Sequence, residues 1–351
     1  MEKVRIGVVG IGSIAHMCHL PGYMNNPYAE LVAVADTDVE RARRVADAFG
    51  GPAVYDSAER MFREAEVDAV SICTFNDTHV SLALSALSHG LDVLVEKPMA
   101  VDLEQAQLLK EAAAASRNLV MVGMSHRYRA DAQALQGLAA AGELGDIYYA
   151  KAKILRRRGV PLGWFTQRLY SGGGPMMDIG VHALDLAWWM MGTPKPKQVF
   201  GKQFREVAPY ETKYASFYEA HSDVNKRDPI YDVEDLGTAL FTFENGSALT
   251  LEASWAANGS QDDALKIELY GTKGGASLDP LQVFKETNRI PVEYVLKTPS
   301  PDLYQAEIDA FVRCVRERQA PLCDANQGFE VVKMLVGIRE SSDKGDIVKF
   351  S

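Results

Sequence analysis

Short apolar runs alternate with longer amphipathic stretches over the first third of the chain. The runs are rich in β-branched residues and several end at glycine or a polar residue, as buried parallel strands do. Strands are expected at Val4–Gly10, Leu31–Ala35, Ala53–Tyr55, Ala69–Cys73, Asp92–Val95 and Leu119–Met124. The stretches between them have helical patterns, such as Val39–Phe49 and Leu103–Ala115. This alternation predicts an α/β fold that begins with a doubly wound Rossmann domain over residues 1–124.

The pattern changes in the second part of the chain, residues 125–351. A helix over Asp131–Ala141 and a strand over Ile147–Leu155 come first, and from Val199 the alternation is typical of antiparallel strands. Asn245-Gly246 is a strong hairpin signal. The remaining expected elements are strands at Asp235–Glu244, Ser247–Ala257, Ala264–Tyr270, Ala276–Leu278 and Val292–Leu296, and helices at Tyr304–Arg318 and Gln327–Ser341. The prediction is a second α/β domain with a large, mainly antiparallel open sheet.

Composition narrows the class of protein. A chain of 351 residues with 47% hydrophobic and 24% charged residues can build two ordinary cores. The net charge of −10 argues against a nucleic acid or an anionic membrane as partner. We expect no membrane span and no signal peptide, because the first apolar run is too short and too early broken. Scattered cysteines without a CxxC pair predict reduced thiols in a cytoplasmic protein.

A glycine-rich turn follows the first expected strand. Gly10-Ile-Gly12-Ser-Ile-Ala15 has the G-x-G-x-x-A form of the dinucleotide fingerprint, between a strand and a helix. Gly10 would allow the tight turn, Gly12 the approach of a pyrophosphate, and Ala15 close packing of helix on strand. The free N–H groups at the start of the helix would bind the phosphates. Cofactor contacts are therefore expected from Gly10, Ile11, Gly12, Ser13 and Ile14.

The second expected strand ends at Asp36, at the distance from the glycines where an acidic residue binds the adenosine ribose. This carboxylate would repel a 2′-phosphate, and Thr37-Asp38 offers no nearby cation. The sequence therefore favours NAD over NADP. The alternative, a turn aspartate that caps the helix from Val39, fits Asp38 better than Asp36.

A second glycine run, Gly172–Gly174, precedes the apolar stretch that ends at Gly192. Glycines let the backbone pass close to a ligand, because they lack Cβ. Asp178 stands where a helix N-cap would, and His182, four residues on, would share its helix face. Such a carboxylate and imidazole suit proton transfer. An ordinary N-cap with a core histidine is the alternative, and these residues alone favour it.

Three ordered motifs give the chain a family resemblance. A strand that ends in Glu96-Lys97-Pro98, after the GxGxxA loop and before the GGGxxxDxGxH segment, resembles the Gfo/Idh/MocA family of sugar and cyclitol oxidoreductases. The resemblance covers essentially the whole chain and implies that Lys97, Asp178 and His182 form the catalytic group. It also implies a cis Lys97-Pro98 bond.

Further cofactor contacts follow from the same resemblance. The family loop T-P-N-x-x-H is kept at Thr74, Asn76 and His79, although Phe75 replaces its proline. Together with Glu96 and Lys97, these three residues are expected at the cofactor. Arg127 is a further candidate, with a structural ion pair as the alternative.

The substrate-binding residues are expected in the second domain as well. The segment Arg156 to Thr166 is similar to the RRxGVPxWGxFT stretch of the family's glucoside 3-dehydrogenases. Arginine forks suit hydroxyls, and a tryptophan face suits a pyranose ring. Arg156, Arg157 and Trp164 are therefore candidates for substrate contact, beside Lys97, Asp178 and His182. A solvated basic patch is the alternative.

The function implied is NAD-dependent hydride transfer from a secondary alcohol of a sugar, glycoside or cyclitol. His182 would be the general base, kept neutral by its place in the first turn of a helix, and Lys97 would stabilise the substrate oxygen. Asp178 would orient substrate and imidazole. Three alternatives stay open: an NAD-dependent glycosidase, a non-catalytic sugar or NAD sensor, and a metal hydrolase that uses Asp178 and His182, for which no third ligand is evident.

Assembly is the last expectation. An open sheet of this size offers a flat face for self-association, and the family commonly forms dimers or tetramers through it. The charged, tyrosine-rich segment Glu206–Asp232 is either a lid or an oligomer arm, and the sequence does not decide between them.

Overall fold

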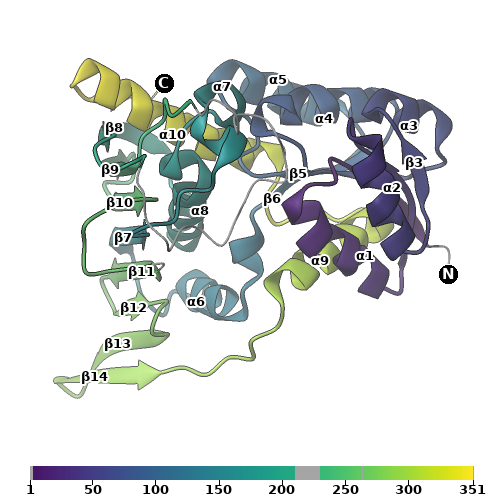
Figure 1. Cartoon of the computed structure of the whole chain (residues 1–351). Coiled ribbons are helices and arrows are strands. Elements are labelled where there is room, and N and C mark those ends of the chain that lie inside the picture. The colour runs from purple at the N-terminus through teal and green to yellow at the C-terminus, as the bar shows by residue number, and fades with distance from the viewer. Residues whose placement is uncertain (1–2, 210–229, 263, 351) are drawn as a thin grey trace.

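The computed structural model describes residues 3–209, 230–262 and 264–350, which form two sheets with helices packed between and around them (Figure 1). The first sheet has six parallel strands in the order β3-β2-β1-β4-β5-β6. Its strands are β1 Val4–Val9, β2 Ala29–Ala35, β3 Ala53–Tyr55, β4 Ala69–Ile72, β5 Asp92–Glu96 and β6 Val120–Gly123. The predicted Rossmann sheet is thus confirmed, and its strand order reverses between β1 and β4, where such sheets bind ligands.

Helices cover both faces of this sheet. The helices of the first domain are α1 Leu20–Asn25, α2 Val39–Ala48, α3 Ala58–Glu64, α4 His79–Ser88 and α5 Leu103–Ala115. Side chains of α3, α4 and α5 join one apolar core, and those of α1 and α2 join another. The expected caps are present, because Asp38 accepts a hydrogen bond from the backbone N–H of Arg41 and Asp102 from that of Gln105.

The second sheet has nine strands in the order β14-β13-β12-β11-β7-β10-β9-β8-β15. Its strands are β7 Ile147–Leu155, β8 Pro196–Phe204, β9 Leu236–Phe243, β10 Ala248–Ser254, β11 Ala264–Gly271, β12 Gly275–Ser277, β13 Gln282–Thr287, β14 Ile290–Val295 and β15 Val348–Lys349. All pairs are antiparallel except β7 with β10. Gly246 turns the predicted β9–β10 hairpin at a φ of 85°. The mainly antiparallel sheet is confirmed.

The two faces of the nine-stranded sheet differ. Helices α6 Ala130–Ala140, α8 Val181–Met190 and α10 Ala325–Lys344 lie between it and the first sheet (Figure 1). The other face shows Phe200 and Leu240, paired across β8 and β9 and about half exposed, among charged residues such as Lys151. No described helix is long and apolar enough to cross a membrane.

The last part of the chain returns to the first domain. Helix α9, Leu303–Glu317, buries Ile308, Phe311 and Val312 in the same core as β1 and α1. A division at residue 124 therefore leaves out one helix of the first domain. The sequence gives no sign of this return, because an amphipathic helix packs equally well on either sheet.

Candidate active site at the domain junction

The glycine loop after β1 has one tight position and one open position. Gly10 has a φ of 82°, and a Cβ there would lie 2.7 Å from the side chain of Thr74. A Cβ at Gly12 would meet no described atom within 4 Å. Ser13 and Ile14, in the following turn, are partly exposed. The loop thus has the open space in front of Gly12 that a pyrophosphate would need.

Asp36, at the end of β2, holds this loop in place. Its Oδ2 accepts a hydrogen bond from Ile11 N at 2.7 Å, and its Oδ1 accepts from Asp38 N at 2.8 Å and Arg41 Nη2 at 2.6 Å. The expectation that no cation lies nearby is wrong. Arg41 stands in the first turn of α2, and its long side chain reaches back to the carboxylate.

Lys97 and Asp178 join the two domains. Lys97 Nζ donates to Asp178 Oδ1 at 3.0 Å and to the carbonyl oxygen of Asp178 at 2.9 Å. Trp255, fully buried just after β10, donates its indole N–H to Asp178 Oδ2 at 3.0 Å. The Lys97-Pro98 peptide is cis, as expected. Both carboxylate oxygens of Asp178 are therefore held, one from each domain.

Asp178 is not the N-cap that its place in the sequence suggested. It is the third residue of a π-helical turn, η5 Met176–Gly180, which runs on into α8. Pro175 precedes this turn and provides no side-chain cap, whereas Glu234 Oε1 accepts a hydrogen bond from Met176 N at 3.1 Å. Short π-turns are frequent at functional sites. The chain has another described one, η1 Ala15–His19, directly after the glycine loop.

The three consecutive glycines pack against protein. A Cβ at Gly172, where φ is 78°, would lie 2.9 Å from Val101 Cβ in the first domain. At Gly174 it would collide with the carbonyl oxygen of Glu234. The ligand approach inferred from these glycines is therefore not needed to explain them, because close contact between segments of the chain already requires them.

His182 lies against a second histidine that the sequence analysis did not select. Its ring centroid is 4.4 Å from that of His126, in the turn η3 Ser125–Tyr128. Neither imidazole forms a hydrogen bond with a described residue, and the Nδ1 atoms of both are buried without a partner. The expected pairing of Asp178 with His182 is absent, since the carboxylate oxygens of Asp178 bind Lys97 and Trp255.

The surroundings keep both imidazoles neutral. Burial lowers the pKa of His182 well below its usual value, and the positive charges of Lys97 and Arg156 lower it further. Burial also lowers the pKa of His126, to about 4, with Arg129 and Lys97 acting in the same direction. A neutral His182 can accept a proton at neutral pH.

Glu96 and the residues of the family loop, which were expected at the cofactor, form hydrogen bonds around Lys97 and at the domain junction. Glu96 is buried, accepts from Lys97 N at 3.1 Å, and contacts His19 Nε2 at 2.9 Å. His79 lies between the carbonyl oxygens of Pro98, at 2.8 Å, and Thr74, at 3.2 Å. Asn76 Nδ2 donates across the domain junction to the carbonyl oxygen of Ser171 at 2.9 Å. These contacts fix the edge of the sheet; whether the residues also touch a cofactor stays a prediction.

Arg127 forms the structural ion pair that was the alternative to a cofactor contact. Its side chain is fully buried and forms a two-pronged ion pair with Asp185, at 2.6 and 2.8 Å. Its Nη1 also donates to the carbonyl oxygen of Leu322 at 2.8 Å. Each of its three guanidinium nitrogens thus has a partner within the protein, which supports the structural ion pair, and contact with a cofactor stays a prediction.

The three residues of the segment predicted to bind substrate have different surroundings in the structure. Arg156 lies near enough to influence His182, whereas Arg157 is exposed. Trp164, in η4 Gly163–Thr166, is 8% exposed and stacks on Phe75, with ring centroids 4.8 Å apart. Phe75, the departure from the family loop, thus reaches across from the first domain. The ring contact with Phe75 covers a face of Trp164 that was expected to bind a sugar.

Four residues of the site escaped the sequence analysis: Arg41, His126, Trp255 and Phe75 as a partner of Trp164. The one sequence signal for His126 was its place next to Arg127, which was already a candidate. Nothing in the spacing, however, pairs His126 with His182 or Trp255 with Asp178. Those pairings arise only when β6, β10 and α8 come together.

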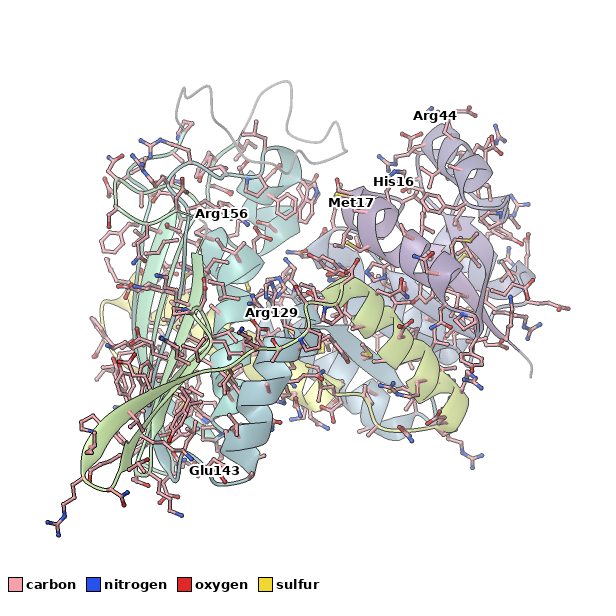
Figure 2. All side chains as sticks on the ribbon, turned by 90° about the horizontal axis from the view of Figure 1, so that it is seen from below. His16, Met17, Arg44, Arg129, Glu143 and Arg156 are labelled. Carbon is pink, nitrogen blue, oxygen red and sulfur yellow. The ribbon has the colours of Figure 1, made fainter. Side chains whose placement is uncertain are left out.

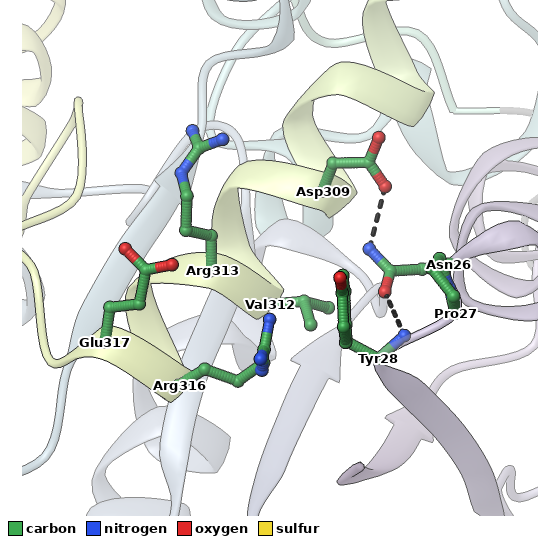
Figure 3. A pocket seen from close by; sticks show the side chains of 8 residues that line it. All are labelled: Asn26, Pro27, Tyr28, Asp309, Val312, Arg313, Arg316 and Glu317. Carbon is green, nitrogen blue, oxygen red and sulfur yellow. Dashed lines mark hydrogen bonds between the residues drawn. The ribbon is translucent and has the colours of Figure 1, made fainter. Parts of the chain in front are cut away.

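Figure 2 shows Arg156 on the side of the second domain and His16 and Met17, just after the glycine loop, on the side of the first. A surface pocket of about 320 Å³ lies elsewhere, between α9 and the loop after α1 (Figure 3). Among its lining residues, Asn26 Nδ2 donates to Asp309 Oδ1 at 2.8 Å. We place the candidate active site at Lys97, Asp178 and His182, because a cation, a carboxylate and an imidazole come together there at the junction of the domains.

Family models match most of the chain. Residues 4–124 match the Gfo/Idh/MocA oxidoreductase family with its NAD-binding Rossmann fold, and residues 132–277 match the C-terminal domain of the same family. The chain belongs to this family. The resemblance seen in the sequence is thus confirmed, and with it the class of oxidoreductases.

Individual relatives agree over the full length. D-glucoside 3-dehydrogenase of Escherichia coli (strain K12) is 31% identical over 99% of this chain and 98% of its own. The scyllo-inositol 2-dehydrogenase (NAD(+)) of Bacillus subtilis (strain 168) is 24% identical over 94% of this chain and 92% of its own. The structure of levoglucosan dehydrogenase in complex with NADH superposes with a TM-score of 0.86 at 21% identity and covers all of both chains.

Among the described residues, no group of three or more His, Cys, Asp and Glu side chains could hold a metal ion. The metal-hydrolase alternative gains no support from this part of the chain. All four cysteines are buried and free.

Proposed function

We propose that this chain is a dehydrogenase that transfers a hydride between a secondary alcohol of a sugar, glycoside or cyclitol and a nicotinamide cofactor, with NAD preferred. The observation that carries the proposal is the cluster of Lys97, Asp178 and His182, in which a cation is fixed beside an imidazole without hydrogen bonds. The names of the sugar and cyclitol dehydrogenases among the relatives support the substrate class.

His182 is the proposed general base. Burial and the neighbouring positive charges keep its ring neutral, so it accepts the hydroxyl proton when the alcohol is oxidised. The same positive charges disfavour the protonated ring, so His182 readily releases the proton it has accepted. After oxidation the proton goes to solvent, and in the reverse reaction it goes to the carbonyl oxygen of the substrate. The nicotinamide ring, when bound, supplies the hydride acceptor.

Lys97 stabilises the negative charge that grows on the substrate oxygen. Its ammonium group is held by the side chain and the carbonyl oxygen of Asp178, which leaves one of its three N–H donors for a ligand. Asp178 acts through Lys97: Trp255 fixes its other oxygen, so the carboxylate orients the ammonium group. A donor that is already in place needs no reorganisation as the oxyanion forms.

The first domain binds the cofactor in this proposal, and the second binds the substrate. Gly12 faces open space at the end of β1, and the region 10–14 would hold the pyrophosphate. Asp36 favours NAD by repelling a 2′-phosphate, although Arg41 offsets part of this repulsion at 2.6 Å. The outer face of the nine-stranded sheet, with Phe200 and Leu240, is the proposed surface for a homodimer or homotetramer.

Most of the Glu206–Asp232 segment lies outside the described residues. Its two ends are held on the second domain: Asp235 Oδ2 accepts from Val207 N at 2.6 Å, and Asp232 Oδ1 accepts from Arg168 N at 2.6 Å. Its role as lid or arm stays undecided.

A panel of glucosides, aldoses and inositols tests the proposal, with NADH formation followed at 340 nm and NADP⁺ as a parallel cofactor. We expect turnover of at least one carbohydrate with NAD⁺. Glycoside cleavage without net NADH would identify the glycosidase alternative instead. Binding of NADH without turnover of any compound would favour the sensor.

A further inference from the structure

His126 has an unexplained position. It stands three residues beyond β6, next to the end of β5, because Glu96 pairs with Gly123 across these strands. Its ring contacts His182, its Nδ1 is buried, and it has no hydrogen bond to a described residue. Buried polar atoms without partners destabilise a fold, so each such group calls for an explanation. Here two of them are adjacent.

The charged groups around His126 are already engaged. Arg129 forms an ion pair with Asp131 at 2.7 Å, and Lys97 is held by Asp178. The neighbouring Arg127 is paired with Asp185. His126 is thus an imidazole without a partner at the edge of the sheet where Lys97 stands, and a bound ligand would supply one.

We propose that His126 hydrogen-bonds the hydroxyl on the carbon next to the one that is oxidised, so that the site accepts vicinal diols. A neutral imidazole carries one donor and one acceptor, which matches a sugar hydroxyl. Two imidazoles with centroids 4.4 Å apart can each bind one of two hydroxyls on adjacent carbons. This inference rests on the proposed function and names the feature of the substrate that the site recognises.

A proton relay from His182 to His126 is the less suitable role for the pair. Lys97 and Arg129 oppose a positive charge on His126, as Lys97 and Arg156 oppose one on His182. Moving the proton from one ring to the other would therefore gain little. A neutral ring that holds a neutral hydroxyl has no such cost.

The test compares substrates that have or lack the contacted hydroxyl. Methyl D-glucoside and its mono-deoxy analogues at the carbons flanking the oxidised one are assayed with wild type, His126→Phe and His126→Asn. Phenylalanine keeps the ring contact with His182 and removes the hydrogen bonds, whereas asparagine keeps a donor and an acceptor. If methyl D-glucoside is not turned over, the fastest carbohydrate of the panel and its deoxy analogues replace it.

We expect His126→Phe to lower kcat/KM by about 10- to 100-fold on the diol, the usual effect of a lost polar contact in a site. On one deoxy analogue, already poor for wild type, the same variant should lower it by about twofold or less. His126→Asn should recover part of the loss. In wild type we expect the rate of alcohol oxidation to fall at low pH, because protonated His182 cannot accept a proton. This acidic limb of the pH profile should persist in both variants, because His182 is still the base.

An equal loss on the diol and on every deoxy analogue would mean that His126 only supports the fold, and an unchanged kcat/KM would mean that it binds no hydroxyl. Disappearance of the acidic limb would make it part of the proton path. Each of these results overturns the inference and leaves the dehydrogenase proposal standing, whereas wild type without turnover of any carbohydrate overturns that proposal itself.

NADH binding reports whether each variant folds, and if His126→Phe does not bind it, His126→Asn alone is compared with wild type. His89→Phe, at the exposed histidine that follows α4 as its C-cap, is the control for a histidine far from the site.

Discussion

The glycine loop with Asp36, and the candidate active site around Lys97, Asp178 and His182, are built in opposite ways. Asp36 bonds to Ile11, Asp38 and Arg41, which lie 25, two and five residues from it along the chain. Lys97 meets Asp178 across 81 residues, and Asp178 meets Trp255 across 77. The first region lies within the segment from β1 to α2, and its carboxylate already accepts three hydrogen bonds. The second exists only when the domains are assembled, and it leaves two imidazoles without partners.

This difference fits a division of tasks. A loop that only binds a cofactor gains from being rigid before the cofactor arrives, because less conformational entropy is then lost on binding. The nitrogen of His182 that accepts a proton, and the nitrogen of His126 that binds a hydroxyl, must be available to the substrate, so a hydrogen bond within the protein at those atoms would hinder both roles. Variants of the two regions should therefore separate turnover from cofactor choice.

His182→Ala is expected to give the largest effect. Loss of the base should lower kcat by about 10²- to 10⁴-fold. The acidic limb of the pH profile for oxidation should disappear, because protonated His182 cannot accept a proton. NADH affinity, measured by fluorescence titration, should stay within about twofold, since the cofactor is held by the other region. Near-normal turnover with the limb intact would place the base elsewhere.

Trp255→Phe tests whether Asp178 must be held from both sides. Removal of the indole N–H leaves one carboxylate oxygen without its bond, and we expect kcat to fall by about 5- to 30-fold, which is roughly 1–2 kcal/mol. KM should change less. Trp188→Phe is the matched control, because its buried indole donates to the carbonyl oxygen of Pro194 at 2.8 Å. Equal losses of kcat in the two variants would show that cavity formation, and not the bond to Asp178, is responsible.

Cofactor choice should respond only to the first region. Asp36→Ala should weaken NAD binding and reduce a preference over NADP that we expect to be at least tenfold, or about 1.4 kcal/mol or more. Arg41→Ala should increase that preference, because it removes the cation beside the carboxylate. Both dissociation constants are measured by calorimetry. Equal affinities of wild type for NAD and NADP would remove Asp36 from the ribose.

The smallest expected effect concerns stability at low pH. The pKa of His126 falls from 6.5 to about 4 on folding, and that of His182 falls as well. Between these values the unfolded chain binds more protons than the folded one, so stability is complete above pH 6.5 and decreases as the pH falls towards 4. For His126 this loss should reach about 2 kcal/mol by pH 5, and the loss for His182 has the same sign. Thermal unfolding at pH 7 and pH 5 should show a smaller decrease in Tm for His126→Phe than for wild type, and the same decrease would contradict this.

Much of the fold could be predicted from the sequence because the signals are local. The strands of the first sheet, the hairpin at Asn245-Gly246 and the caps at Asp38 and Asp102 depend on the residues within each element. The return of α9 to the first domain could not be predicted, since its apolar stripe has no mark that selects one sheet. The cap assigned to Asp178 failed for a related reason: a π-turn and an α-helical turn differ by one residue in their bonding, and the sequence around Pro175 fits both.

The sequence by itself was enough to select the candidate residues for the chemistry. Gly10–Ile14, Asp36, Glu96-Lys97-Pro98, Asp178 and His182 are recognisable from their types, their order and the strand ends on which they stand. Only the tertiary structure decided what each of them touches: Arg41 on Asp36, Trp255 on Asp178, Phe75 on Trp164 and His126 beside His182. The reason is physical. Backbone conformation follows from neighbours along the chain, whereas the hydrogen bonds, charges and burial that set a side chain's reactivity come from segments that the fold brings together from far apart.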